Sequence, residues 1–113
     1  MNPVSEAKLW YWQRISAMVL ALCVLVHLVT IIYAVRSGLS GEALLARTRG
    51  NVPFGLFYSV FLGACAVHVP IGLARIAEEW LGWSSRAARG TARVFTLLLV
   101  LLGLAAVYAM VLA

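Results

Sequence analysis

Three apolar runs of about twenty residues each constrain this chain more than any other feature, because a helix of that length spans the hydrocarbon core of a membrane. The runs extend from about Ile15 to Val35, from about Phe54 to Ala77 and from about Val94 to Ala113. They are much longer than typical β-strands, and three spans cannot close a β-barrel. The sequence therefore predicts an all-α membrane protein with three transmembrane helices.

The composition supports a membrane protein and argues against a soluble enzyme. The 113 residues are 64% hydrophobic and 12% charged, whereas soluble domains are roughly 45–50% apolar and about 25% charged. A chain of this length forms a single domain, residues 1–113. The net charge of +5 comes from basic residues scattered between the apolar runs. Because they form no continuous patch, we expect membrane lipid and no nucleic acid as a partner.

The polar segments between the runs predict the topology of the chain. Aromatic residues in the stretch 9–14 are typical of a membrane interface, 41–47 is a candidate short interfacial helix, and 84–93 is a predicted basic loop. The N-terminal segment and second loop hold six basic residues, and the first loop holds three: Lys8, Arg14, Arg75, Arg86, Arg89 and Arg93 against Arg36, Arg47 and Arg49. The excess predicts a cytoplasmic N-terminus and an external C-terminus.

The two cysteines do not indicate a disulfide framework. Cys23 and Cys65 both lie inside apolar runs, where a thiol usually packs as a small apolar side chain. We therefore expect no disulfide between them. The first apolar run is also too long for a cleavable signal peptide, and no small-residue cleavage site follows it closely.

The two histidines of the chain, His27 and His68, each lie within a predicted transmembrane helix. An ionisable side chain at that depth is costly and usually faces the protein interior. One interpretation is a neutral imidazole that only hydrogen-bonds to a neighbouring helix. Two histidines with no Asp or Glu at membrane depth favour ligation of a metal, because a proton relay normally uses carboxylates.

The residues around His68 suit a porphyrin. Ala64 and Gly72 lie one turn to either side on the same helix face and leave a flat wall. Arg75 is seven residues further on the same face, where it is a candidate partner for a haem propionate. Pro70 is expected to bend the helix, since it removes a backbone donor. Small residues also line ordinary contacts between transmembrane helices.

The expected depths of the two histidines differ. His27 lies 13 residues after Arg14, roughly 20 Å from the cytoplasmic end, and His68 lies 9 residues before Ala77, roughly 14 Å from that end. Helices in direct contact are only about 8–10 Å apart, too close to enclose a porphyrin between them. Two haems at different depths are therefore favoured over one shared haem, and each needs a second axial ligand from another chain.

Two motifs resemble those of the cytochrome b membrane anchors of succinate dehydrogenase and fumarate reductase. The run Gln13-Arg14-Ile15-Ser16-Ala17 resembles the His-Arg-x-Ser-Gly start of the first helix in this family. The run from His68 to Trp80, HVPIGLARIAEEW, resembles its haem-ligand helix, in which His-x-x-x-Gly precedes an acidic and an aromatic residue. Motif order, spacing and a three-helix layout extend the resemblance over nearly the whole chain.

The resemblance implies a haem b anchor subunit of a succinate:quinone or quinol:fumarate oxidoreductase, in a bacterial or archaeal plasma membrane. A flavoprotein and an iron–sulfur subunit are then expected on its cytoplasmic face, with the dicarboxylate handled there rather than by this chain. Electrons would pass between the iron–sulfur subunit and menaquinone or ubiquinone near the start of the first helix. The family pattern places quinone contacts at five positions: Arg14, Ser16, Trp10, Glu79 and Trp80.

His68 matches the usual haem b ligand of the family, whereas His27 resembles the first-helix ligand of members with two haems. The resemblance therefore implies two haems, with His27 serving the outer one and Arg36 and Arg75 as candidate propionate partners. The chain would form half of a haem-binding bundle, completed by a homologous chain or a second copy. Two departures are notable: Gln13 replaces the motif histidine, and Trp10 replaces a quinone-site serine.

Three other interpretations remain open on the sequence. A haem-free anchor of the same complex would use both histidines structurally. A small transporter or assembly subunit would have no redox role and no flavoprotein partner. An unrelated dihaem cytochrome b usually carries paired histidines on four or more helices, which exceeds the number of spans in this chain.

Overall fold

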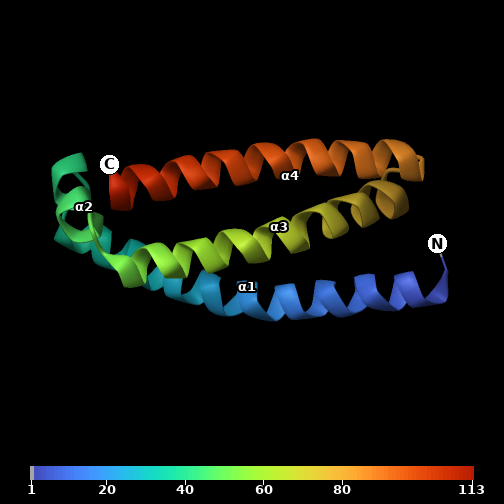
Figure 1. Cartoon of the computed structure of the whole chain (residues 1–113), viewed down its shortest axis with the longest axis horizontal. Helices are drawn as coiled ribbons and strands as arrows, with labels where there is room; N and C mark the ends of the chain where they lie inside the picture. The colour runs from blue at the N-terminus through green and yellow to red at the C-terminus, as the bar shows by residue number, and fades with distance from the viewer. Residues whose placement is uncertain (1) are drawn as a thin grey trace.

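A computed structural model describes residues 2–113 of the chain, and all of its regular structure is helical (Figure 1). Helix α1 covers Pro3–Ser37, α2 Gly41–Thr48, α3 Val52–Trp80 and α4 Ser85–Val107, and a π-helical turn, η1, covers Tyr108–Leu112. Three segments are long and apolar enough to cross a membrane: Pro3–Ser37, Val52–Trp80 and Ser85–Leu112. The predicted all-α, three-span fold is confirmed.

Each of the four α-helices starts at a residue whose side chain caps its first turn. Asn and Ser are good caps because their oxygens accept a hydrogen bond from an otherwise unpaired backbone N–H. The capping side chains are those of Asn2, Ser40, Asn51 and Ser84. The last cap makes the predicted basic loop 84–93 wrong: α4 begins at Ser85, so that Arg86, Arg89 and Arg93 lie on its first turns.

The helices extend past the apolar runs at their polar ends. At 1.5 Å per residue, the 35 residues of α1 are roughly 50 Å long, against a hydrocarbon core of about 30 Å. The start of α1 at Pro3 therefore lies beyond the expected span, as does the end of α3 at Trp80. The predicted interfacial helix 41–47 corresponds to α2, which spans Gly41–Thr48.

Helix α3 lies between α1 and α4 and contacts both (Figure 1). Alanines form a buried cluster in its interface with α4: Ala74 and Ala77 from α3 meet Ala88 and Ala92. Further along, the side chain of Leu62 fills the space that a side chain at Gly103 would need. Small residues allow helix backbones to approach closely, which is the main source of packing energy between helices in lipid.

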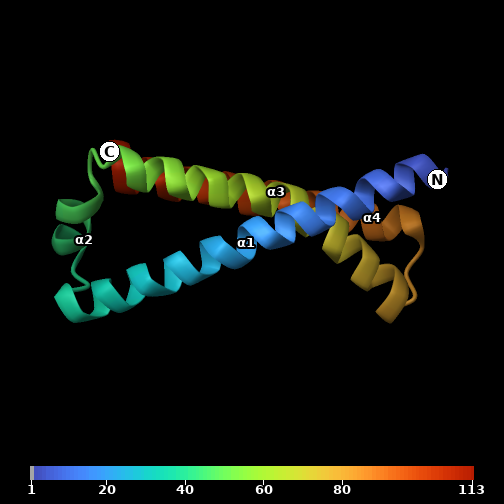
Figure 2. The same cartoon turned by 90° about the horizontal axis from the view of Figure 1, so that it is seen from below.

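The first half of α1 crosses α3, and the second half of α1 diverges from α3 and α4 (Figure 2). Helix α2 occupies the gap at the diverging ends. The end of α2 and the connection that follows it are joined to η1 by two hydrogen bonds, from Thr48 Oγ1 to the Met110 carbonyl (2.6 Å) and from the Gly50 N–H to the Val111 carbonyl (2.8 Å). Thr48 on α2 and Gly50 after it therefore each supply a donor to a carbonyl of the π-helical turn.

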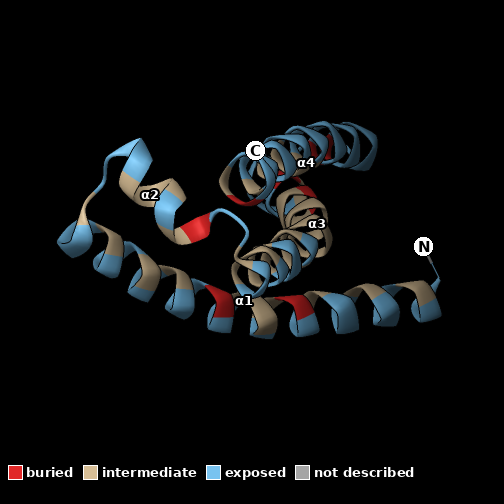
Figure 3. Ribbon diagram, turned by 60° about the vertical axis from the view of Figure 1, so that its left-hand side comes forward, coloured by how far each residue is buried: buried red, intermediate tan, exposed pale blue. Residues whose placement is uncertain are grey.

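Exposed and half-buried residues make up most of every helix, and the buried residues are few and small (Figure 3). Leu22, Leu102 and Leu112 are each about 70% exposed, at 68%, 71% and 72%. Such surfaces are stable in lipid or against other transmembrane chains. Helix α3 also bends in its second half, where Pro70 lies within the helix (Figure 2).

Candidate functional site

The point where α1 crosses α3 brings together a serine and a histidine that are far apart in the sequence. The Oγ of Ser16 lies 3.3 Å from Nδ1 of His68, and it also donates a hydrogen bond to the Gln13 carbonyl at 3.1 Å. Ser16 is 5% exposed. With Nδ1 engaged, Nε2 is the ring nitrogen of His68 that remains for a further ligand.

The expected flat wall around His68 is partly covered by α1. The Nε2 atom of Gln13 would lie 3.1 Å from a Cβ atom at Gly72, so that the glycine admits the Gln13 amide group rather than leaving open space. The prediction of an open wall was therefore wrong at Gly72. The Oε1 atom of Gln13 is buried and has no hydrogen-bond partner among residues 2–113.

His27 makes a similar contact on the outer side of the crossing. Its Nδ1 lies 2.8 Å from the hydroxyl of Tyr58 on α3, and its ring packs edge-on against Tyr58 and Phe61 with centroids 5.6 Å apart. In both histidine sites a hydroxyl on the facing helix holds Nδ1. Such a partner fixes the ring orientation and leaves Nε2 for binding, as is usual for metal-ligating histidines.

The two contacts also fix the relative depth of the histidines. Helices α1 and α3 are antiparallel. Toward the end of the molecule that holds α2, His27 lies eleven residues after Ser16 on α1, and Tyr58 lies ten residues before His68 on α3. Since Ser16 contacts His68, His27 lies roughly 16 Å further out along α1. The histidines therefore belong to two sites at different depths.

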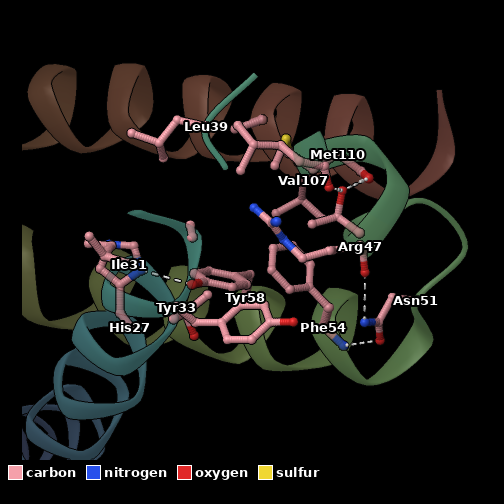
Figure 4. Close-up of a pocket in the computed structure, with 15 residues that line it drawn as sticks. His27, Ile31, Tyr33, Leu39, Arg47, Asn51, Phe54, Tyr58, Val107 and Met110 are labelled. Carbon is pink, nitrogen blue, oxygen red and sulfur yellow. Dashed lines mark hydrogen bonds between the residues drawn. The ribbon is translucent and has the colours of Figure 1, made fainter. Parts of the chain in front are cut away.

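A cavity of about 720 Å³ lies in the wedge between the diverging helices, at the end of the molecule that holds α2 (Figure 4). Its volume is within the range of roughly 300–1,000 Å³ that is typical of sites for small molecules and cofactors. Most of its lining is apolar or aromatic, with contributions from every helix and η1: His27, Thr30, Ile31, Tyr33, Ala34, Leu39, Leu44, Arg47, Thr48, Asn51, Phe54, Tyr58, Ala106, Val107 and Met110. We call this the outer cavity.

Arg47 is the cationic residue that lines the outer cavity, and its guanidinium group points toward the middle of the lining side chains (Figure 4). It donates a hydrogen bond to the Gly38 carbonyl at 2.8 Å and lies over the ring of Tyr33, 5.5 Å from its centroid. No carboxylate within residues 2–113 forms an ion pair with it. Arg36, the residue that we expected near a propionate, is exposed and does not line this cavity.

At the opposite end, a groove of about 340 Å³ lies between the start of α1, the end of α3 and the start of α4. It contains Arg75, Arg89 and Arg93 together with Glu6 and Glu78. Arg75 forms an ion pair with Glu6 at 3.3 Å, and both side chains are more than 40% exposed. An exposed pair of this kind is worth only about 0–1 kcal/mol, so it does not commit Arg75 to Glu6.

The expected quinone residues divide between two faces of α1. Arg14 lies over the ring of Trp10, 5.2 Å from its centroid, and both side chains are exposed. Ser16 lies on the buried face, turned toward His68. Glu79 and Trp80 are exposed at the end of α3, on the same end of the molecule as Trp10. None of these residues lines the outer cavity or the groove.

Three residues that matter in this geometry were not predicted from the sequence: Tyr58, Arg47 and Gln13 in its contact with Gly72. Because α1 and α3 are antiparallel, the contact between Ser16 and His68 sets a register that places Tyr58 opposite His27. The sequence does not predict that the Arg47 side chain points into the outer cavity, because its direction depends on how far α1 diverges from α3.

Cys23 and Cys65 are free thiols in the structure. No group of three or more His, Cys, Asp or Glu side chains within residues 2–113 is arranged to hold a metal ion. Iron in a porphyrin would need only one or two ligands from the protein, each from a single side chain. The residues present therefore fit a haem that takes a single histidine from this chain at each depth.

The comparisons with known proteins agree with the two motifs. The family model described as the succinate dehydrogenase/fumarate reductase transmembrane subunit matches residues 1–110. No curated protein and no solved structure gives a significant match. Together with the three membrane-spanning helices, the match over nearly the whole chain shows that this protein belongs to the family of succinate dehydrogenase/fumarate reductase transmembrane subunits.

Proposed function

We propose that this membrane subunit binds haem b and carries electrons between an iron–sulfur subunit and a membrane quinone. The observation that carries the proposal is the pair of histidines at two depths, each held at Nδ1 by a hydroxyl from the facing helix. This arrangement engages Nδ1 of each ring and orients the ring, so that Nε2 is the nitrogen that would bind iron. Haem b, when bound, supplies a one-electron carrier within the membrane.

The residues of this chain would hold two such groups. His68 would ligate an inner haem and His27 an outer haem, with the second axial ligands coming from a homologous chain or a second copy. The outer cavity offers an apolar and aromatic lining, and Arg47 provides a positive charge, paired with no carboxylate of residues 2–113, of the kind that a propionate prefers. We therefore assign Arg47, rather than Arg36, as the outer propionate partner. Arg75 remains the candidate propionate partner of the inner haem.

Quinone binding is proposed at the exposed stack of Arg14 and Trp10, with Glu79 and Trp80 from α3. A guanidinium group there would donate hydrogen bonds to a quinone oxygen and stabilise the negative charge that develops as the quinone is reduced. The flavoprotein and the iron–sulfur subunit would dock at the same end of the molecule, which carries the six basic residues and is proposed to face the cytoplasm. Either succinate oxidation or fumarate reduction is compatible with this layout.

The test is a dithionite-reduced minus oxidised visible spectrum of the detergent-purified complex, with haem measured per copy of this chain. We expect His27→Ala and His68→Ala each to abolish one b-type signal and to leave the other. Ser59→Ala is the matched control, because it removes a polar side chain from α3 whose hydrogen bond is made within its own helix. It should retain both signals.

A haem-free anchor is the second candidate, because the hydroxyl contacts of Ser16 and Tyr58 satisfy one nitrogen of each histidine without any cofactor. It predicts a complex that contains the flavoprotein but shows no b-type band. Loss of a signal only in His68→Ala would instead reduce the proposal to a single-haem anchor.

A further inference from the structure

We propose that Ser16 is a positioning residue that holds His68 in the tautomer with the proton on Nδ1, so that Nε2 is the nitrogen presented to iron. The part of this proposal that concerns iron rests on the proposed function. The part that concerns the tautomer rests only on the contacts of this chain. The resemblance to the family places Ser16 among the quinone contacts, and the structure assigns it a different role.

The first step is the direction of the hydrogen bond from Ser16. A serine hydroxyl carries one hydrogen, and a backbone carbonyl can only accept. The hydroxyl of Ser16 lies 3.1 Å from the Gln13 carbonyl, three residues earlier in the same helix. Its single hydrogen is therefore used within α1, and its oxygen faces His68 as an acceptor.

The second step is the proton on His68. Because the Ser16 oxygen accepts, the hydrogen in the 3.3 Å contact must come from Nδ1. A neutral imidazole carries one N–H, so that Nε2 then holds a lone pair. Axial ligation of iron requires that lone pair. At 3.3 Å the contact is longer than the usual 2.9–3.0 Å of an N–H···O hydrogen bond, so the preference that it gives to the Nδ1–H tautomer is smaller than that of an ordinary hydrogen bond.

The third step is the contrast with His27. The hydroxyl of Tyr58 lies 2.8 Å from Nδ1 of His27. A phenol hydroxyl both donates and accepts, so this contact admits either tautomer. The hydrogen-bond partners of Ser16 therefore fix the tautomer of His68, whereas the contact of Tyr58 leaves that of His27 open. His27 can thus serve as a comparison within the same chain.

The fourth step is the position of Ser16 on its helix. It is 5% exposed, whereas Arg14, two residues earlier, is exposed on the opposite face. Residues two apart do not share a helix face. A quinone in contact with Arg14 therefore cannot also receive a hydrogen bond from Ser16 while α1 and α3 remain packed at this crossing.

The direct test is ¹⁵N NMR of the full chain in lipid bilayers without haem, labelled only at histidine. The chain contains two histidines, and a His27→Gln variant assigns the signals of His68. Protonated and bare ring nitrogens have well-separated shifts. We expect Nδ1–H and bare Nε2 for His68 in the unchanged chain and in Ser16→Thr, which keeps a hydroxyl.

Ser16→Ala should shift His68 toward the other tautomer by about two- to fivefold, the lower part of the equilibrium effect of one hydrogen bond, because the contact is long. Tyr58→Phe is the matched control and should leave the His68 signals unchanged. A proton on Nε2 of His68 in the unchanged chain, or identical signals in Ser16→Ala, would overturn the proposal. Because no haem is present, this result is independent of the proposed function.

The second measurement uses the purified complex. If His68 ligates haem, Ser16→Ala should weaken retention of that haem roughly tenfold or more and raise its midpoint potential, since the loss of an Nδ1–H acceptor makes the imidazole a poorer donor to iron. Ser16→Thr should restore both. A raised KM for quinone in Ser16→Ala, with the potential unchanged, would return Ser16 to the quinone site and contradict the proposal.

Discussion

At the scale of single residues, the chain depends on a few polar side chains placed among apolar ones. Ser16, Tyr58 and Arg47 each contact a group from another helix or from the connection after α1. In lipid such groups find no water to replace a lost partner, and hydrogen bonds between transmembrane helices typically contribute about 0.6–2 kcal/mol each. Changes at these positions should therefore affect cofactor binding more than the fold.

The charge of Arg47 gives the residue-scale prediction for the outer cavity. Arg47→Gln should reduce retention of the His27-dependent haem by roughly tenfold or more, because a charge-assisted hydrogen bond contributes about 1.5–3 kcal/mol. Haem content per chain, titrated against increasing detergent, measures this effect. Arg36→Gln is the matched control, since Arg36 is exposed and outside the cavity. Equal losses in the two variants would remove Arg47 from the site.

At the scale of the helices, close packing between α3 and α4 depends on the absence of side chains at particular positions. Leu62 occupies the space beside Gly103, whereas a Cβ atom at Gly63 would meet nothing within 4 Å. The two glycines thus differ sharply, although both lie inside transmembrane helices.

Gly103→Ala should destabilise the α3–α4 pair by about 1–3 kcal/mol, the usual cost of overpacking a tight contact. Gly63→Ala should be neutral or stabilising, because alanine is the better helix former and has open space there. Thermal unfolding of the chain in detergent, followed by circular dichroism, separates the two. A smaller effect for Gly103→Ala than for Gly63→Ala would contradict this account of the interface.

The helices also show how much of the fold could be predicted. The three apolar runs were sufficient to predict the spans, because lipid admits few alternatives to a helix. The start of α4 was missed because the basic residues from Arg86 to Arg93 suggested a loop, although Ser84 is a good N-cap. The separation of Arg14 from Ser16 follows from helical periodicity alone. The inward direction of Arg47 depends on tertiary contacts and could not be predicted.

At the scale of the whole molecule, the two ends differ in charge. The end that contains the start of α1 and the connection between α3 and α4 holds six basic residues, and the end with α2 holds three. By the positive-inside rule, the first end is the one that we propose to face the cytoplasm. The proposed iron–sulfur partner and quinone site lie at that end, and the outer cavity lies near the other.

Labelling with a membrane-impermeant maleimide tests this orientation. Glu42→Cys, on α2, should react in intact spheroplasts. Ser85→Cys, at the start of α4, should react only in inverted vesicles from which the peripheral subunits have been removed. The unchanged chain is the control, because Cys23 and Cys65 lie within the membrane-spanning helices and should not react. The reverse pattern would invert the proposed topology.

The divergence of α1 from the other helices has a mechanical consequence. Helix α2 and the connection after it are tied to η1 through Thr48 and Gly50, so these parts together form one wall of the outer cavity. The outer half of α1 forms the opposite wall, and polar contacts hold it at His27 and Gly38. A small rotation of α1 about its crossing with α3 at Ser16 would widen the cavity only if the His27–Tyr58 and Arg47–Gly38 hydrogen bonds opened, while the distance between Ser16 and His68 would hardly change.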